Sequence, residues 1–292
     1  MTLKQRLSAY FRLARMDKPI GTLLLLWPTL WGLWIAGQGR PDWHLIVIFC
    51  LGTWLMRSSG CVINDWADRD IDGHVERTKA RPLATGEIKS RHALYFAAAL
   101  ALLALLIALP LNEKALLLTI PALFLAATYP FTKRFLPVPQ AYLGIAFSFG
   151  IPMAFAATGT AQTDSIPPIT WVLMLANLLW TVAYDTEYAM VDKPDDLKIG
   201  IKTSAITFGR FDVAAVMACF GGFLALMLWV GVLAERGMIY FFGLGLVTVA
   251  LADQYRRIRG RERAACFAAF LANNRIGAII FAALALDFIF PL

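Results

Sequence analysis

Long apolar runs dominate this chain of 292 residues and limit what it can fold into. Nine of them, each about 17–25 residues long, have the length that an α-helix needs to cross a bilayer. They lie near residues 19–37, 43–63, 92–110, 115–131, 138–157, 167–185, 210–232, 237–255 and 268–290. Charged residues make up 16% of the chain, whereas a soluble domain has about 25%. The sequence therefore predicts an all-α membrane protein, a bundle of about nine transmembrane helices.

Lysine and arginine residues lie almost entirely on one side of these predicted spans. Of the 27 such residues, all but Arg40, Lys114 and Arg236 fall in or near the loops on the side of the N-terminus. Cytoplasmic loops carry such an excess, so we expect a cytoplasmic N-terminus and, with an odd number of spans, a periplasmic C-terminus. The net charge of +7 follows this topology and does not indicate a nucleic-acid partner.

Residues 1–18 form an amphipathic N-terminal segment. Leu3, Leu7, Tyr10, Phe11 and Ala14 recur at helical spacing, with basic residues on the other faces. This pattern is typical of a helix that lies in the membrane interface, although a helix that caps the bundle explains it equally well. We expect residues 19–292 to form a single transmembrane domain.

A first cluster of acidic residues directly follows the second predicted span. Asn64, Asp68 and Asp72 are spaced four residues apart, so they form one stripe if that span continues as a helix, and Asp65 flanks the same face. Carboxylates this close to a membrane are costly and mark functional sites. Oxygen ligands of this kind suit Mg²⁺ that is completed by a substrate phosphate.

A second acidic cluster follows the sixth predicted span. Asp185 and Asp192 are seven residues apart, about two helical turns. Asp192 and Asp196 are four apart, but Pro194 disfavours a helix at Lys193, so Asp192 is alternatively the N-cap of a new helix. Either cluster alone fits a solvated loop. Two clusters on one side of the membrane favour a shared site that holds divalent cations against a phosphorylated substrate.

Basic residues come after each cluster and are predicted to bind a diphosphate. Arg77 and Arg81 follow the first cluster, and Lys198 and Lys202 follow the second. Arginine binds phosphate oxygens in a bidentate fork, and lysine acts as a point charge. Only their proximity to the acids singles them out, because any of them is also explained by the excess of cytoplasmic cations.

These motifs carry a resemblance to a known family. Asn64-Asp65-x-x-Asp68-x-x-x-Asp72 with Arg77-Thr-x-x-Arg81-Pro-Leu, and Asp192-x-x-x-Asp196 with Lys198-Ile-Gly-Ile-Lys202-Thr, resemble the two signatures of the UbiA superfamily of intramembrane prenyltransferases. Within it the chain is most similar to the 4-hydroxybenzoate polyprenyltransferases, through the stretches 17–31, 129–134 and 184–192.

The resemblance implies a helical bundle around a central cavity that opens laterally to lipid. It implies that Mg²⁺ is the cofactor, held by Asn64, Asp65, Asp68, Asp72, Asp192 and Asp196, of which Asp68, Asp72, Asp192 and Asp196 are catalytic. Arg134, Tyr129 and Asp185 are the implied acceptor-binding residues. The partners are then a polyprenyl diphosphate, 4-hydroxybenzoate and membrane lipid, in the inner membrane of a bacterium.

Two other functions fit the same sequence. A prenyltransferase of this superfamily with another aromatic acceptor, such as a dihydroxynaphthoate, homogentisate or haem, has the same acidic motifs. An ion or metabolite transporter also carries acids within its spans. Transporters usually place these acids at broken helices near the midplane, whereas here they lie near one face.

Overall fold

Helices are the only regular secondary structure in the described part of the chain. A computed structural model describes residues 2–159 and 166–291. Its helices, in chain order, are α1 (Leu3–Leu13), α2 (Ile20–Ala36), α3 (Trp43–Asp68), η1 (Asp72–His74), α4 (Ser90–Ala108), α5 (Glu113–Thr132), α6 (Pro139–Ser148), α7 (Gly150–Thr158), α8 (Pro168–Ile199), α9 (Ser204–Phe208), η2 (Gly209–Phe211), α10 (Asp212–Leu233), α11 (Met238–Ile258) and α12 (Arg263–Ile289). The described residues form no strand, so the predicted all-α class is confirmed.

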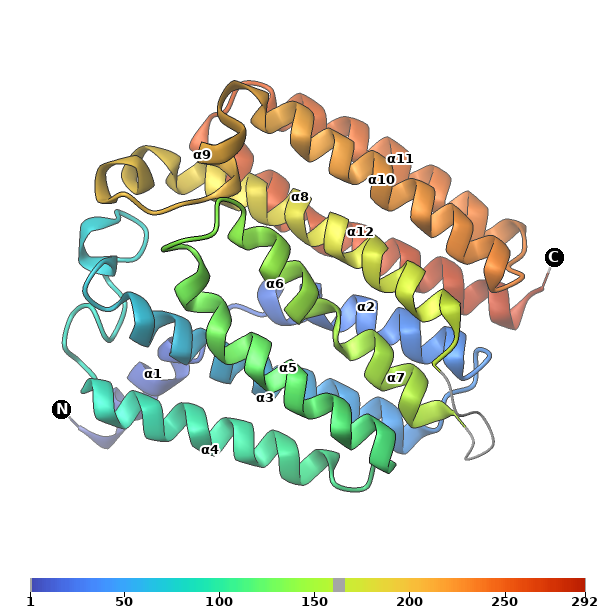
Figure 1. Cartoon of the computed structure of the whole chain (residues 1–292), viewed down its shortest axis with the longest axis horizontal. Helices are drawn as coiled ribbons and strands as arrows, with labels where there is room; N and C mark the ends of the chain where they lie inside the picture. The colour runs from blue at the N-terminus through green and yellow to red at the C-terminus, as the bar shows by residue number, and fades with distance from the viewer. Residues whose placement is uncertain (1, 160–165, 292) are drawn as a thin grey trace.

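The long helices run side by side as a bundle (Figure 1). The N-terminus, η1 and α9 lie at one end of it, and the C-terminus lies at the other. Within the described part of the chain, seven helical segments are long and apolar enough to cross a membrane, and α6 and α7 together form one of them. α2 is apolar but only 17 residues long, and the 32 residues of α8 include the second acidic cluster. The predicted count of nine spans therefore stays a prediction.

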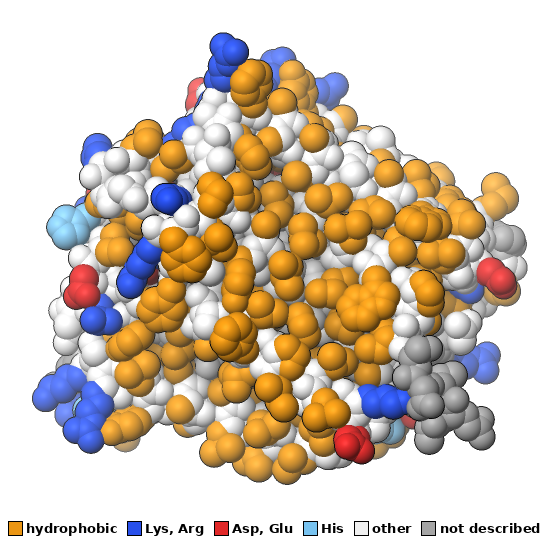
Figure 2. Space-filling model, viewed as in Figure 1, with side chains coloured by type: hydrophobic (Ala, Val, Ile, Leu, Met, Phe, Trp, Pro, Cys, Tyr) orange, Lys and Arg blue, Asp and Glu red, His pale blue; other side chains and the backbone are white. Residues whose placement is uncertain are grey.

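Apolar side chains cover the middle of the visible face, and charged ones gather toward its ends (Figure 2). α5 and α11 contribute large exposed side chains, among them Ile120, Phe124, Phe242 and Val249. Soluble proteins rarely expose apolar patches of this extent, so the surface is one that lipid covers.

α8 lies at the centre of the packing, against α6, α10 and α12. Trp180 of α8 is fully buried between Trp31 and Phe223, with ring centroids 5.2 and 5.7 Å away. Its indole Nε1 donates a 3.0 Å hydrogen bond to Asn273 of α12. A buried aromatic stack with its polar atom satisfied fixes the helix that carries the second acidic cluster.

Two expectations about the helices that carry the acids were wrong. α3 continues past residue 63 but ends at Asp68, so Asp72 leaves the predicted stripe and begins the 3₁₀ turn η1. The Thr78 hydroxyl donates to the Asp72 carbonyl at 2.8 Å, and this bond stabilises the turn in place of a further helical turn. Asp192 is no N-cap, because α8 continues through Pro194 until Gly200, whose φ of 73° ends it.

The predicted span near 138–157 is divided into α6 and α7 at Phe149. Pro152 contributes to the division, since it has no N–H to donate to Ser148 and lies in the first turn of α7, where proline is best tolerated. Gly150 lies where a Cβ would overlap the Thr29 side chain, so a glycine there lets α7 approach α2 closely.

α1 presents two apolar faces. Ala9 and Leu13 are fully buried against the bundle, whereas Leu3 and Leu7 are 74% and 62% exposed. The exposed face is what an interfacial helix needs, and its position in the membrane interface stays a prediction.

Candidate active site

A cavity of about 1900 Å³ lies within the bundle, lined by α2 to α8 and part of α12. Both acidic clusters line it, although they come from the ends of α3 and α8, more than a hundred residues apart. The members of the two clusters on its wall are Asp65, Asp68, Asp72, Asp185, Asp192 and Asp196, together with the amide of Asn64, and Asp17 and Glu113 line it as well. Most of the remaining wall is apolar. The sequence thus predicts correctly that the two clusters face one cavity.

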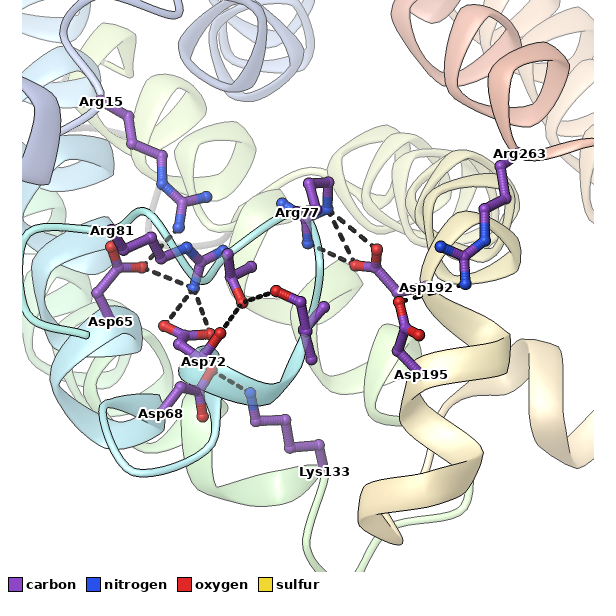
Figure 3. A network of polar contacts seen from close by, with 12 residues as sticks. Arg15, Asp65, Asp68, Asp72, Arg77, Arg81, Lys133, Asp192, Asp195 and Arg263 are labelled. Atoms are coloured by element: carbon purple, nitrogen blue, oxygen red, sulfur yellow. Dashed lines mark hydrogen bonds and ion pairs between the residues drawn. The ribbon is translucent and has the colours of Figure 1, made fainter. Parts of the chain in front are cut away.

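Four of the acids that line the cavity are paired with a cation (Figure 3): Asp65, Asp68, Asp72 and Asp192. Arg81 lies 3.0 Å from Asp65 and 2.8 Å from Asp72. Arg15 also pairs with Asp65, at 2.5 Å. These pairs tie the residues before α2 and the loop after η1 to the end of α3.

Two further pairs connect the clusters to each other and to α5. Lys133, directly after α5, pairs with Asp68. Arg77 follows the first cluster in the chain but pairs with Asp192 of the second at 2.5 Å, and its guanidinium lies 4.4 Å from the Tyr188 ring centroid. Arg77 therefore bridges the two clusters directly.

Asp72 illustrates what burial does to an acid here. The side chain is 7% exposed, and its burial raises the pKa of Asp72 above the usual value, while the charge of Arg81 acts in the opposite direction. Desolvation disfavours the charged carboxylate and a nearby cation favours it. The ionised form of this acid therefore depends on positive charge beside it.

The donor set fits a magnesium ion that a substrate phosphate completes. Asp68 is 3% exposed, and its Oδ1 is buried with no hydrogen-bond partner, while Lys133 contacts only Oδ2. Among the described residues, no three acidic, histidine or cysteine side chains are grouped closely enough to hold a metal ion by themselves. Mg²⁺ typically takes only one or two carboxylates, with waters and phosphate oxygens as its other ligands.

Some of the other predicted site residues line the cavity and some do not. Arg77, Arg81, Lys202, Tyr129 and Asp185 line the cavity. Lys202 also donates to the Phe135 carbonyl at 3.1 Å. These residues come from four segments that the fold brings together.

Two residues that were predicted to bind the substrates, Lys198 and Arg134, do not line the cavity. Lys198 is 78% exposed and lies 3.9 Å from Asp195. Arg134 donates to the Ala67 carbonyl at 2.9 Å, with its guanidinium 5.3 Å from the Phe131 ring centroid. Their predicted roles gain no support from these contacts and stay predictions.

Sequence reasoning did not select Arg15, Arg57 or Lys133, all of which line the cavity. Lys133 stands beside the selected Arg134, and nothing in the sequence decides which of the two faces the acids. Arg57 is a charged residue inside a predicted span, which is itself a signal of function. Its Nε is buried with no partner. Arg15 belongs to the segment interpreted as interfacial.

The fold and the cavity define a class: an all-α membrane protein that brings two acidic clusters to the polar end of an apolar cavity. The chain belongs to the UbiA prenyltransferase family, whose model matches residues 25–281. The predicted family and the predicted class of enzyme, a prenyltransferase, are therefore confirmed.

Curated relatives match almost the full length of the chain. It is 62% identical over 289 residues to the 4-hydroxybenzoate octaprenyltransferase of Azoarcus sp. (strain BH72), covering 99% of both chains. It is 64% identical over 288 residues to the protein of the same name from Nitrosomonas eutropha (strain DSM 101675 / C91 / Nm57), covering 98% of this chain and 99% of the relative.

Solved structures share the fold. A UbiA homolog from Aeropyrum pernix K1, in an apo structure, superposes with a TM-score of 0.81 at 25% identity, covering 91% of this chain and 97% of the other. A UbiA homolog from Archaeoglobus fulgidus bound to GPP and Mg²⁺ gives 0.70 at 22% identity, covering 96% and 99%. The second likeness is one of fold alone.

Proposed function

We propose that this protein transfers a polyprenyl group from a polyprenyl diphosphate to 4-hydroxybenzoate, at the ring carbon ortho to the hydroxyl, in a Mg²⁺-dependent step of ubiquinone biosynthesis. The observation that carries the proposal is the cavity, where both acidic clusters and the cations that pair with them lie together and most of the remaining wall is apolar. A diphosphate with a long hydrocarbon tail has the same division of charge. The names of the curated relatives support this choice of donor and acceptor.

The polar end is where the diphosphate binds. Mg²⁺ would be held by Asn64, Asp65, Asp68 and Asp72 on one side and by Asp192 and Asp196 on the other, and when bound it neutralises charge on the departing diphosphate. Arg77 and Arg81 have the forked donors that phosphate oxygens accept, and Lys133 and Lys202 add point charges. These cations stabilise the negative charge that develops as the allylic C–O bond breaks.

The apolar walls hold the prenyl chain and keep water away. Leu24 of α2, Phe49 of α3 and Leu143 of α6 line the cavity and are buried. An allylic cation reacts with any water that reaches it, so exclusion of water suppresses hydrolysis. Alkylation of the acceptor ring is then the favoured outcome.

The acceptor is proposed to bind beside Tyr129 and Asp185. Arg57, on α3, lines the same cavity, and its buried unpartnered Nε suits the carboxylate of a benzoate. Arg134, which was also predicted to bind the acceptor, donates to the Ala67 carbonyl at the end of α3, and its role in acceptor binding stays a prediction.

Product mass tests the proposal. The purified protein is incubated with Mg²⁺, octaprenyl diphosphate and one acceptor at a time: 4-hydroxybenzoate, a dihydroxynaphthoate, homogentisate or haem. We expect a prenylated product with 4-hydroxybenzoate alone, its loss with EDTA and its recovery when Mg²⁺ is added back. Product formed only with another acceptor, or solute flux in proteoliposomes without any product, would contradict the proposal.

A further inference from the structure

Asp192 and Asp196 lie near the end of α8, on either side of Pro194, which weakens the helix at that point. Pro194 cannot donate the backbone hydrogen bond that position 194 would otherwise make to residue 190. The helix nevertheless continues to Ile199. Lys193 and Asp195 lie in the same turns but do not line the cavity. Their contacts with other helices hold these turns in place.

A buried carboxylate outside the cavity holds Lys193. Asp212, at the start of α10, is fully buried, and its Oδ2 accepts from Lys193 Nζ at 2.9 Å. Lys193 Nζ also donates to the Gly209 carbonyl at 3.0 Å. The other oxygen of Asp212 accepts from Arg261 Nε at 2.9 Å and from the Val213 N–H at 2.8 Å. Asp212 therefore joins α8, α10 and the loop between α11 and α12.

The first residue of α12, Arg263, makes a second connection to α8. Arg263 Nη2 donates to Asp195 Oδ2 at 3.2 Å, on the side of the helix away from Arg77 (Figure 3). Arg261 has a φ of 56°, a left-handed conformation that a residue with a side chain adopts only when its surroundings impose it. Here its guanidinium donates to Asp212 and to the Arg210 carbonyl, and these bonds hold the loop against η2 and the start of α10.

We propose that Asp212, with Lys193 and Arg261, and the Asp195–Arg263 pair form a clamp of positioning residues that sets where Asp192 and Asp196 lie for binding Mg²⁺–diphosphate. This inference rests on the proposed function, because it assigns the clamp to the second acidic motif. None of the clamp residues is among those that line the cavity. They act through the α8 backbone, as outer-shell partners orient metal ligands in other sites.

Binding of Mg²⁺ with inorganic pyrophosphate tests the clamp without needing turnover. Isothermal titration of the full chain in detergent micelles compares the wild type with Lys193→Met, Asp212→Asn and Asp195→Asn. We expect each variant to weaken binding about 10-fold, and to raise the KM for polyprenyl diphosphate more than it lowers kcat. Lys193→Arg keeps the charge and the reach, so it should bind like the wild type.

The matched control is Asp253→Asn, which breaks the exposed 2.7 Å Asp253–Arg257 pair on α11 without touching α8. We expect it to leave pyrophosphate binding unchanged. Wild-type binding by both Lys193→Met and Asp195→Asn would overturn the clamp. If Asp212→Asn does not fold, these two partly exposed sites still decide the question.

A further variant separates the clamp from the proposed function. Asp196→Asn removes a proposed ligand itself, and we expect it to abolish pyrophosphate binding. Retained binding in Asp196→Asn would refute the site. Lost binding there with unchanged binding in Lys193→Met and Asp195→Asn would refute only the clamp.

Discussion

At the scale of single residues, Asp68 is the most informative acid of the site. It is almost completely buried, one of its oxygens pairs with Lys133, and the other has no partner. A buried polar atom left unpaired costs about 1–3 kcal/mol. A cation bound at this oxygen would remove that cost, so the residue combines an existing partner with an unused coordination position.

Asp68 and its neighbour Asp70 form a matched pair for mutagenesis. Asp68→Asn removes the charge from the cavity, and we expect kcat to fall about 10²-fold or more, because several kcal/mol of transition-state stabilisation are lost. Asp70 is 77% exposed, pairs with Arg69 and is not among the residues that line the cavity, so Asp70→Asn should change kcat little. Prenyl transfer by both variants in detergent measures the difference, and equal activities would argue against Asp68 as a ligand.

The acids of this site could be identified from the sequence, whereas the cations that pair with them could not. The spacing of Asn64, Asp65 and Asp68 on one helix is local information, so it predicts which of them share a face. Lys133 and Arg15 reach the same acids from distant segments, and no local pattern specifies a contact of that kind. The misplacement of Asp72 has a local cause, a turn stabilised by Thr78 that helical periodicity does not reveal.

At the scale of elements, α12 approaches α2 and α8 through a glycine. A Cβ at Gly277 would overlap the Trp27 ring and lie 3.0 Å from Trp180. Trp27 is held by a 2.8 Å hydrogen bond to Asn274, so it cannot move aside freely. The close approach also lets Trp31 Nε1 donate to the Gly277 carbonyl at 3.3 Å.

Gly277→Ala should therefore destabilise the bundle. Overpacking a filled core costs about 1–3 kcal/mol, and we expect a lower midpoint when the protein is unfolded by SDS in mixed micelles. Gly245 of α11 is exposed with open space around it. Gly245→Ala should leave the midpoint unchanged or raise it, since alanine is the better helix former. A lower midpoint for Gly245→Ala alone would contradict this view of the packing.

Helix boundaries were the least predictable feature of the fold. Apolar length correctly predicted the region of α6 and α7 as one span. It did not reveal the interruption at Phe149 within that span. For Pro194 the sequence left open whether the helix is interrupted. A proline that is expected to interrupt a helix is accommodated inside α8, where contacts from Asp212 and Arg263 hold the turns around it.

At the scale of the whole molecule, all the acids of the site lie at the end of the bundle that also carries the N-terminus (Figure 1). The distribution of lysine and arginine predicts that this end faces the cytoplasm. Lys79 is 55% exposed near the first acidic cluster, and Met238 is 74% exposed at the start of α11. These two positions report on opposite ends of the bundle.

Single cysteines at these positions test the orientation. In a background whose four native cysteines are replaced, Lys79→Cys should react with a membrane-impermeant maleimide only in inverted inner-membrane vesicles. Met238→Cys should react only in spheroplasts. Labelling in the opposite pattern would reverse the predicted topology and place the substrate site at the periplasmic face.

The central claim is that two separate acidic clusters bind a single Mg²⁺–diphosphate. Titration of Mg²⁺ with inorganic pyrophosphate into the wild type, Asp68→Asn, Asp192→Asn and the double variant tests it most directly. Residues that act on one ligand are coupled, so their effects do not add. We predict a single binding event in the wild type. Each single variant should lose it, and the double variant should behave like the single variants. Two independent events, each removed by only one substitution, would contradict the account.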